Sequence, residues 1–541
     1  MRPRGWLSLA FLFVGAGLLT AAAFAGPSQK RGGTLRVAFG RDVDSLDPAV
    51  AYQTGSWGLE FATCAKLYNY PDTSAGEGAT VVPEVAAGFP KISPDGKTQT
   101  IELKRTYRFH TGQRITAAHF AAAINRGASH ELDSGALSYL HEIVGADAVA
   151  NGDAHAVAGV RVLAPYTLQI RTTTPVNDIA SRLTMPFFCP VSVDTPLREI
   201  HDPLGSGPYY VVSYVPNRRI VLERNRFYRG PRAANVDRIE FTVGVGPGDC
   251  RVAVERNEID ACGSGIPPGD WAELASKYGI NRPNGRVFFN PALATNYLAF
   301  NHDRPAFKGP GQIPLAKAIN WAIDRHALVQ AAGYLGGLRT DQILPSAMGR
   351  PASIYPINGV TDAALAKARA LLAQAKFKPK SLVLWAPSFG LWGPGAQILQ
   401  YNLKRIGIDV QIQYFQSFGQ MAPKSGIRGA PYDVILQGWF VDYADPISFF
   451  STLNGNLQPT GNPNAAYFDN PKWNRKIARI SRLSGNARAK AWADLDVEMM
   501  RDDPPWAPFM TPAGRDFVSA SLDCYVYHPV YGFDLAAACK K

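Results

Sequence analysis

Asp442 and Asp445 are two carboxylates in a stretch of the chain that is otherwise almost wholly apolar and aromatic, QGWFVDYADPISFF, residues 437–450. A carboxylate in apolar surroundings is costly unless hydrogen-bond donors or a positive charge meet it. Asp445 precedes Pro446 and a predicted short helix, which is the pattern of a helix N-cap. Asp442 is therefore the candidate binding residue, the alternative being a loop acid that bonds nearby backbone amides.

The motifs of a secreted hydrolase do not occur in this chain. A GxSxG elbow, an HExxH zinc helix and an SxxK serine site are all missing from the sequence. His130-Glu131 and His141-Glu142 begin like zinc motifs, but Ser134 and Gly145 stand where the second histidine would be. We predict no catalysis, no metal site and no cofactor, and keep a secreted hydrolase as the alternative from another class.

The segment before the two aspartates is predicted to contain three strands and one helix. The strands cover residues 381–387, 409–415 and 432–440, and the helix covers residues 394–406. A strand, a helix and a strand at this spacing are typical of a parallel, doubly wound lobe. Ligands of such lobes bind beyond the carboxyl ends of the strands, and Asp442 directly follows the third strand. Aromatic side chains beside the expected cleft are candidate ligand contacts: Trp57, Trp392, Trp439 and Tyr443.

The rest of the chain also alternates strand-like and helix-like segments. A strand is predicted over residues 34–39, and a turn at Asp95-Gly96 leads into another. Asp47, before Pro48, predicts a further helix N-cap. Helical spacing is found in three more segments, the second with Asp324 as a cap or break: residues 116–126, 313–332 and 362–376.

Length and composition indicate a folded protein of several units. The 541 residues, 46% of them apolar, correspond to about three globular units. The formal net charge is +12, but the lysines and arginines are scattered rather than gathered in a basic block. We therefore predict no binding to nucleic acid.

The first 25 residues have the pattern of a secretory signal peptide. Arg2 and Arg4 precede an apolar run from Trp6 to Leu19, and Ala23-Phe24-Ala25 offers the small residues of a cleavage site. An uncleaved membrane anchor is the alternative, since Trp6 to Ala25 is long enough to span a bilayer. We expect an exported protein, periplasmic or at the cell surface.

Export favours disulfides between the six cysteines, because an even number of thiols would meet an oxidising compartment. Six cysteines allow fifteen pairings. Cys250 with Cys262 and Cys524 with Cys539 are close in sequence, which leaves Cys64 with Cys189. The sequence contains no CxxC motif, which argues against both a redox site and a cysteine zinc site.

Several short pieces of the chain follow one another over about five hundred residues: GGTLRVAF with DSLDP, YRFHTGQRITAAHF, PLGSGPYYVVSYVPNRRIVLERNRFYRG, YLAFNHDRPAF with AIDRHALV, KARALLAQA and GWFVDYADP. In this order the chain resembles the extracellular solute-binding proteins of family 5, the dipeptide and oligopeptide receptors of ATP-binding-cassette (ABC) importers. One departure is His119 in TAAHF, at a helix where the family often has an acid.

The resemblance implies an α/β fold of two lobes, like other periplasmic binding proteins, that close over a ligand. The first lobe is enlarged by an extra subdomain. The predicted division of the chain is a signal peptide at 1–25, lobe I at 33–80, 200–290 and 505–541, the extra subdomain at 81–199, and lobe II at 291–504.

The resemblance also implies a role for two residues. In peptide-binding members an aspartate of the segment matching GWFVDYADP pairs with the ammonium group of the peptide, and by position that residue is Asp442. Trp439 lines the side-chain pocket in the same comparison. The expected function is capture of di- or oligopeptides by a monomeric receptor, which delivers them to an ABC permease in the cytoplasmic membrane.

A non-peptide solute is the alternative ligand, because the family also serves oligosaccharides, opines and metal chelates. A neutral sugar would leave the acid at position 442 unpaired, which is costly in a closed site.

Overall fold

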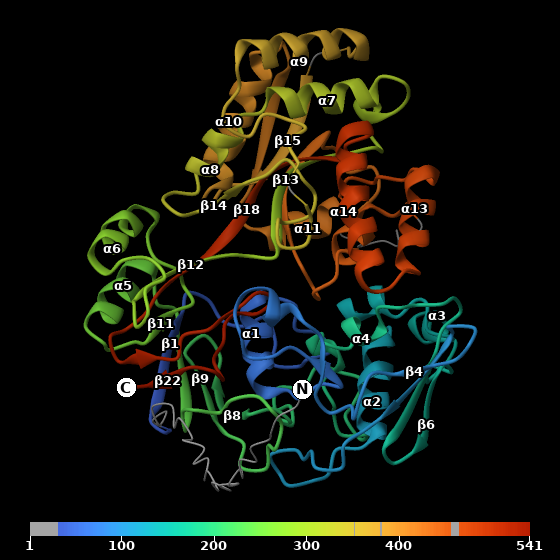
Figure 1. The fold of residues 1–541 in the computed structure, drawn as a ribbon, viewed down its shortest axis with the longest axis vertical. Helices are drawn as coiled ribbons and strands as arrows, with labels where there is room; N and C mark the ends of the chain where they lie inside the picture. The colour runs from blue at the N-terminus through green and yellow to red at the C-terminus, as the bar shows by residue number, and fades with distance from the viewer. Residues whose placement is uncertain (1–30, 351, 379–380, 456–464) are drawn as a thin grey trace, which may run out of the picture.

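The computed structural model describes residues 31–541 except 351, 379–380 and 456–464, so the predicted signal peptide lies outside the described residues. The chain forms two lobes, one above the other in Figure 1. No helix within the described ranges has the length and apolar content needed to cross a membrane.

Lobe I, at the bottom of Figure 1, contains a five-stranded sheet in the order β11 (Ala261–Cys262), β1 (Thr34–Phe39), β10 (Arg238–Val243), β9 (Arg219–Arg224) and β8 (Tyr209–Val215). β1 pairs in parallel with β10 and β11, and the other pairs are antiparallel. Leu35 and Val37 alternate toward one face, as expected of a half-buried strand, and pack with Leu59 of helix α1 (Thr54–Thr63). Helices α5 (Pro247–Glu255) and α6 (Trp271–Tyr278) lie at the left edge of Figure 1.

The extra subdomain, at the lower right of Figure 1, holds an antiparallel sheet in the order β4 (Lys91–Ile92), β5 (Thr98–Glu102), β7 (Thr167–Arg171) and β6 (Val160–Ala164). Helices α3 (Ala146–Ala150) and α4 (Ile179–Arg182) also belong to this subdomain. Helix α2 (Ala117–Ala128) packs on this sheet through Phe120 and Ile124. The backbone N–H of Thr116 donates a 2.9 Å hydrogen bond to Nδ1 of His119. The departure at His119 therefore completes a capping box at the start of α2.

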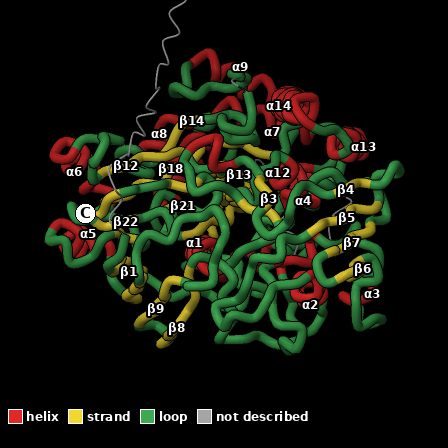
Figure 2. The backbone as a smooth tube through the Cα atoms, turned by 60° about the horizontal axis from the view of Figure 1, so that its bottom comes forward, coloured by secondary structure: helices red, strands yellow, loops and turns green. Residues whose placement is uncertain are grey.

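Lobe II contains a seven-stranded sheet whose main path runs β12 (Val287–Pro291), β18 (Trp506–Phe517), β13 (Ala294–Phe300), β17 (Val434–Phe440), β15 (Ser381–Pro387) and β16 (Asp409–Phe415), with β14 (Gly337–Arg339) paired to β18. One face is covered by α7 (Gln312–Ala322), α8 (Arg325–Gln330), α9 (Asp362–Ala375) and α10 (Trp392–Lys404). The other face carries α13 (Pro471–Ser481) and α14 (Gly485–Asp502), and α11 (Phe418–Ser425) follows β16. Figure 2 shows the strands of the three large sheets as separate yellow groups.

Strand β18 runs between the two lobes. Its first half pairs with β13 of lobe II, and its second half, from Ala513 to Phe517, pairs with β12. The next residue, Val518, bridges to Ala261 in lobe I. The predicted boundary at residue 505 is therefore too early, because the first half of β18 extends the lobe II sheet. The rest of the domain division stays a prediction.

Asp324 and Asp47 show where local capping signals hold and where they fail. The Asp324 side chain accepts a 3.1 Å hydrogen bond from Ala327 N–H and caps α8, as predicted. The predicted helix after Asp47 is wrong, because residues 48–50 form a turn. Asp47 is fully buried and accepts hydrogen bonds from Nη1 and Nη2 of Arg126, at 2.9 and 2.8 Å. This ion pair joins lobe I to α2 and requires the carboxylate there.

The structure contains the three predicted disulfides, Cys64–Cys189, Cys250–Cys262 and Cys524–Cys539. The first joins the end of α1 in lobe I to the extra subdomain, just after the short 3-10 turn Pro186–Phe188. Of the residues described, only Asp523, Cys524 and Cys539 form a group with metal-ligand spacing, and its two thiols are joined in a disulfide.

Candidate functional site

Asp442 lies in the loop that follows the carboxyl end of β17 and precedes the short helix α12 (Ile447–Phe450). β17 is an inner strand, antiparallel to β13 and parallel to β15. Its central position holds the start of the loop rigidly at the edge of the lobe II sheet that faces lobe I. The sequence pattern correctly placed Asp442 beyond the end of a parallel strand.

The Asp442 carboxylate is 6% exposed and is held by hydroxyl groups from both lobes. The Tyr52 hydroxyl, from the loop before α1 in lobe I, donates a 3.0 Å hydrogen bond to Oδ1. The Ser448 hydroxyl donates a 3.1 Å bond to Oδ2, and Tyr139 of the extra subdomain also hydrogen-bonds the carboxylate. Asp442 is therefore the point at which lobe I, the extra subdomain and lobe II meet.

The partners of Asp442 are all neutral. Within the described ranges no lysine, arginine or histidine forms an ion pair with this carboxylate. Burial raises the pKa of Asp442 to about 6, and the hydrogen bonds from Tyr139, Tyr52 and Ser448 offset only part of that effect. A buried carboxylate without a counter-charge favours a cationic group that enters the site.

Four aromatic residues, Tyr52, Trp57, Tyr139 and Phe187, form a cluster next to Asp442. The Tyr52 ring lies 5.5 Å from the Trp57 ring and 5.6 Å from the Phe187 ring, centroid to centroid. Trp57 is buried and its indole N–H donates to the carbonyl of Ala51, whereas Tyr52 is 44% exposed. The accessible wall is therefore the Tyr52 ring, backed by Trp57 and Phe187. Such a wall suits an apolar group or a cation.

Trp439, on β17, is half-buried and is linked to the same site through Ser448. Its indole nitrogen lies 3.4 Å from Oγ of Ser448, the hydroxyl that also binds Asp442. The structure thus links Trp439 to Asp442 through Ser448, and Trp57 through Tyr52.

Tyr443 was predicted as a ligand contact, but in the structure its side chain is buried between the lobes. It is 2% exposed, and its hydroxyl donates a 2.9 Å hydrogen bond to Asp178 of the extra subdomain. The next residue, Ala444, donates its backbone N–H to the hydroxyl of Tyr70 in lobe I, also at 2.9 Å. Both contacts hold the Asp442 loop against the other lobe, so Tyr443 joins the lobes in this arrangement.

Asp445 combines a capping hydrogen bond with an ion pair. Its Oδ1 accepts a 3.0 Å bond from the N–H of Ile447, the first residue of α12, although the N-cap position itself is held by Pro446, one residue later than predicted. Arg488 of α14 binds both carboxylate oxygens, at 2.9 and 3.1 Å. Asp445 is thereby neutralised inside lobe II and, unlike Asp442, needs no external cation.

Trp392 is not brought to this site. It begins α10, packs against Phe418 with ring centroids 5.1 Å apart, and lies over Gly438. Gly438 and Trp439 are neighbours on β17 and face opposite sides of the sheet. Trp392 therefore belongs to the helix-covered face, away from Trp439.

The sequence did not point to Tyr52, Tyr139, Phe187 or Ser448. Ser448 lies six residues after Asp442, so only the helical turn of α12 returns it to the carboxylate. Tyr139 and Phe187 come from the extra subdomain, and no local pattern connects them to residues near position 442.

Comparison with known proteins gives relatives with the same architecture. The family model for bacterial extracellular solute-binding proteins, family 5 Middle, matches residues 80–460. The chain is 25% identical over 415 residues to the probable D,D-dipeptide-binding periplasmic protein DdpA of Escherichia coli (strain K12), which covers 76% of this chain and 75% of that protein. It is 24% identical over 512 residues to the periplasmic oligopeptide-binding protein OppA of the same organism, covering 89% and 88%.

Solved structures share the fold over almost the whole chain. The clavulanic acid biosynthesis oligopeptide binding protein 2 superposes with a TM-score of 0.84 at 23% identity, covering 95% of this chain and 96% of that one. DppA from Helicobacter pylori, solved in complex with the peptide STSA, superposes with a TM-score of 0.76 at 19% identity, covering 94% and 98%. The family match over most of the chain shows that this protein belongs to the bacterial extracellular solute-binding proteins of family 5.

Proposed function

We propose that this protein is an exported receptor that captures peptides between its two lobes by their terminal ammonium group and delivers them to an ABC permease. It binds its ligand without catalysis and acts as a monomer. The observation that carries the proposal is the Asp442 carboxylate, buried between the lobes with only neutral hydroxyl partners within the described chain. A peptide ammonium would supply the missing charge.

Two further observations support a peptide ligand. The accessible Tyr52 ring and the half-buried Trp439 offer apolar contact near the carboxylate, which suits a first side chain of varied shape. The names of relatives such as DdpA and OppA state that they bind dipeptides and oligopeptides, and the Helicobacter pylori structure contains a peptide.

The first experiment identifies the native ligand. The protein is first purified under native conditions, so that it keeps its ligand. It is then denatured, and the small molecules that it releases are analysed by mass spectrometry. Peptides with a free amino terminus are the expected result. An oligosaccharide, an opine or a metal chelate in their place would overturn the peptide assignment while leaving the receptor role intact.

The second experiment tests the ammonium contact directly. Isothermal titration compares a peptide with the same peptide acetylated at its amino terminus, which keeps the length and the side chains but removes the charge. We expect the acetylated peptide to bind about 30-fold to several thousandfold more weakly, the usual result of removing one partner of a buried charge pair. Equal affinities would contradict the proposed role of Asp442. Recovery of the peptide unchanged after long incubation checks that no cleavage occurs.

A further inference from the structure

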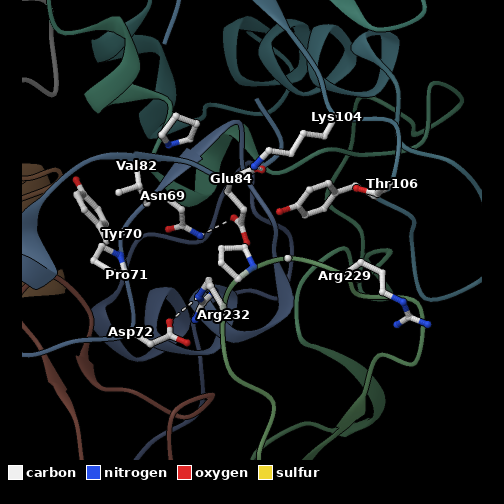
Figure 3. Close-up of a pocket in the computed structure, with 14 residues that line it drawn as sticks. Asn69, Tyr70, Pro71, Asp72, Val82, Glu84, Lys104, Thr106, Arg229 and Arg232 are labelled. Atoms are coloured by element: carbon white, nitrogen blue, oxygen red, sulfur yellow. Dashed lines mark hydrogen bonds and ion pairs between the residues drawn. The ribbon is translucent and has the colours of Figure 1, made fainter. Parts of the chain in front are cut away.

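A cavity of about 630 Å³ lies between lobe I and the extra subdomain. It is formed by the short strands β2 (Tyr68–Asn69) and β3 (Val82–Pro83), the segment after β5, and the loop 229–232 (Figure 3). Asp442 is not among the residues that line it. The volume is in the range of sites that hold small organic ligands, about 300 to 1,000 Å³.

The two acids that line this cavity are already neutralised by the protein. Glu84 accepts hydrogen bonds from the amide of Asn69 at 2.7 Å and from the Tyr228 hydroxyl at 2.7 Å. Asp72 accepts from Nε of Arg232 at 2.8 Å. Figure 3 shows the bonds to Asn69 and Arg232 as dashed lines. Asp72 is paired with Arg232, and Glu84 interacts with the charges of Lys66 and Arg232, so neither carboxylate lacks a counter-charge as Asp442 does.

The hydrogen-bond donors that line the cavity are only partly used. The Tyr107 side chain is 2% exposed, and within the described chain its hydroxyl has no hydrogen-bond partner. The Nη2 group of Arg232 also lacks a hydrogen bond among those residues, and a carboxylate oxygen of Asp534 lies 3.9 Å away. Lys104 Nζ donates one 2.7 Å bond, to the carbonyl of Glu84, and an ammonium group has three donors.

Most of the remaining wall of the cavity is apolar, apart from Thr106 and Arg229. Pro71, Val82, Pro83 and Pro231 line it together with the Tyr70 ring. A bare inorganic ion would fill a small part of this volume and leave the apolar wall in contact with water. The surplus of donors and the apolar wall therefore favour a ligand with an anionic end and an apolar body.

We propose that this cavity binds a small organic carboxylate, with the carboxylate at Lys104, Arg232 and Tyr107 and its apolar body against the prolines. This site is separate from the peptide site at Asp442. The proposal does not depend on the peptide ligand, because it rests on different residues and on the opposite ligand charge.

Isothermal titration of the full protein, freed of its co-purified ligand by unfolding and refolding, tests the proposal with three probes. Benzoate carries a carboxylate on an apolar ring, benzylamine has a ring with the opposite charge, and inorganic phosphate has charge without a ring. We expect saturable binding of benzoate, no binding of benzylamine and weaker binding of phosphate. Absence of saturable benzoate binding, or equal binding of benzoate and benzylamine, would overturn the proposal. Phosphate binding as tight as benzoate would overturn the apolar part of it.

Two variants with the same change of charge locate the probe. Lys104→Gln removes a proposed contact and should weaken benzoate binding by about tenfold or more. Lys404→Gln is the matched control, because Lys404 is an exposed lysine of α10 in lobe II and does not line the cavity. It should change the affinity less than about twofold. Equal losses in the two variants would mean that benzoate responds to net charge alone.

A third variant removes the unpartnered hydroxyl. Tyr107→Phe keeps the ring and should lower the affinity for benzoate by about tenfold while leaving Tm unchanged or higher. Unchanged benzoate affinity would exclude Tyr107 from the site. Asp442→Asn should leave benzoate binding unaltered, and a loss there would place the probe in the interlobe site and overturn the proposal.

Discussion

Tyr443 and Asp178 join the two lobes through a 2.9 Å hydrogen bond between buried groups. Arg182 binds the same carboxylate at 3.1 Å, so Asp178 accepts from a tyrosine of lobe II and from an arginine of its own subdomain. Burial alone would raise the pKa of Asp178, but the charges of Arg182 and Arg488 lower it below its ordinary value. The carboxylate is therefore ionised at neutral pH and is a strong acceptor for the hydroxyl.

Tyr443→Phe should weaken ligand binding without unfolding the protein. The ring still fills its site, but the closed arrangement loses a hydrogen bond to a charged acceptor, which corresponds to about tenfold in affinity. Isothermal titration measures the affinity, and small-angle scattering measures how far ligand reduces the radius of gyration. Tyr401→Phe, at a ring that is 65% exposed on α10, is the control. Equal affinity in wild type and Tyr443→Phe would show that this bond does not contribute to closure.

Asp442→Asn should abolish or strongly weaken peptide binding and leave the fold intact. Asparagine keeps the size of the side chain but removes the charge that the ammonium requires, at a cost of about 2 to 5 kcal/mol in binding. Titration with the native ligand measures the loss. Unchanged affinity would favour an uncharged solute.

Asp445→Asn should lower the stability of the fold and leave peptide binding nearly unchanged, the reverse of Asp442→Asn. Asparagine caps a helix about as well as aspartate, but the buried Arg488 would lose its bidentate partner. We expect about 3 to 5 kcal/mol less stability toward urea, with little change in the affinity of the folded fraction. A large loss of affinity at full stability would mean that Asp445, too, contacts the ligand.

The stability of the ligand-free protein should depend on pH through Asp442. Its pKa is about 6 in the folded state, raised by burial, and about 3.9 in the unfolded chain. The folded state therefore holds this proton more tightly, and the resulting stabilisation is present below about pH 4 and lost as the pH rises through 6. The asparagine of Asp442→Asn does not ionise, so only the wild type loses this stabilisation as the pH rises. Between pH 4 and pH 8 the free energy of unfolding of the variant should therefore rise by about 1 to 3 kcal/mol relative to that of the wild type.

Urea unfolding of both proteins at pH 4, 6 and 8 measures this difference. A gap between the two proteins that stays constant with pH would show that the Asp442 carboxyl titrates as an ordinary surface acid.

Removal of the Cys64–Cys189 disulfide should affect both stability and binding. The bridge closes a span of 125 residues, and its loss should cost about 2 to 5 kcal/mol. Phe187, two residues before Cys189, packs against Tyr52, so the double serine variant should also bind ligand more weakly. The Cys250→Ser/Cys262→Ser variant is the control, expected to lose stability with unchanged affinity. Equal affinity in both variants would separate the disulfide from the site. The exported wild type should show no reactive thiol on denaturation.

Local patterns in the sequence predicted elements well where the cause is local. The strand at residues 34–39 and the cap at Asp324 depend on side-chain alternation and on a hydrogen bond between near neighbours, and both are confirmed. Asp47 looked the same locally, but its carboxylate is paired with Arg126, 79 residues away, and no helix follows it. A capping signal does not distinguish these two uses of a carboxylate.

The same limit applies to the candidate site. Asp442, Trp439 and Trp57 were predicted, and the structure brings them together around Ser448 and Tyr52. Trp392 was also predicted as a ligand contact, but it lies on the opposite face of the sheet from Trp439. That difference depends on which residues of β17 face each side, and Trp392 packs over Gly438. Tyr139 could not be found, since it reaches Asp442 only through the packing of the extra subdomain against both lobes.

Strands β1 and β22 (Cys539–Lys540) lie together in lobe I (Figure 1). The Lys540 side chain packs next to Gly33. A tether attached at either end of the described chain would therefore pull on lobe I alone. Lobe II is reached only through chain that crosses between the lobes, such as β12 and β18, and would carry none of the load. A protein immobilised on a sensor surface at residue 31 or at residue 541 should thus open and close as it does when free.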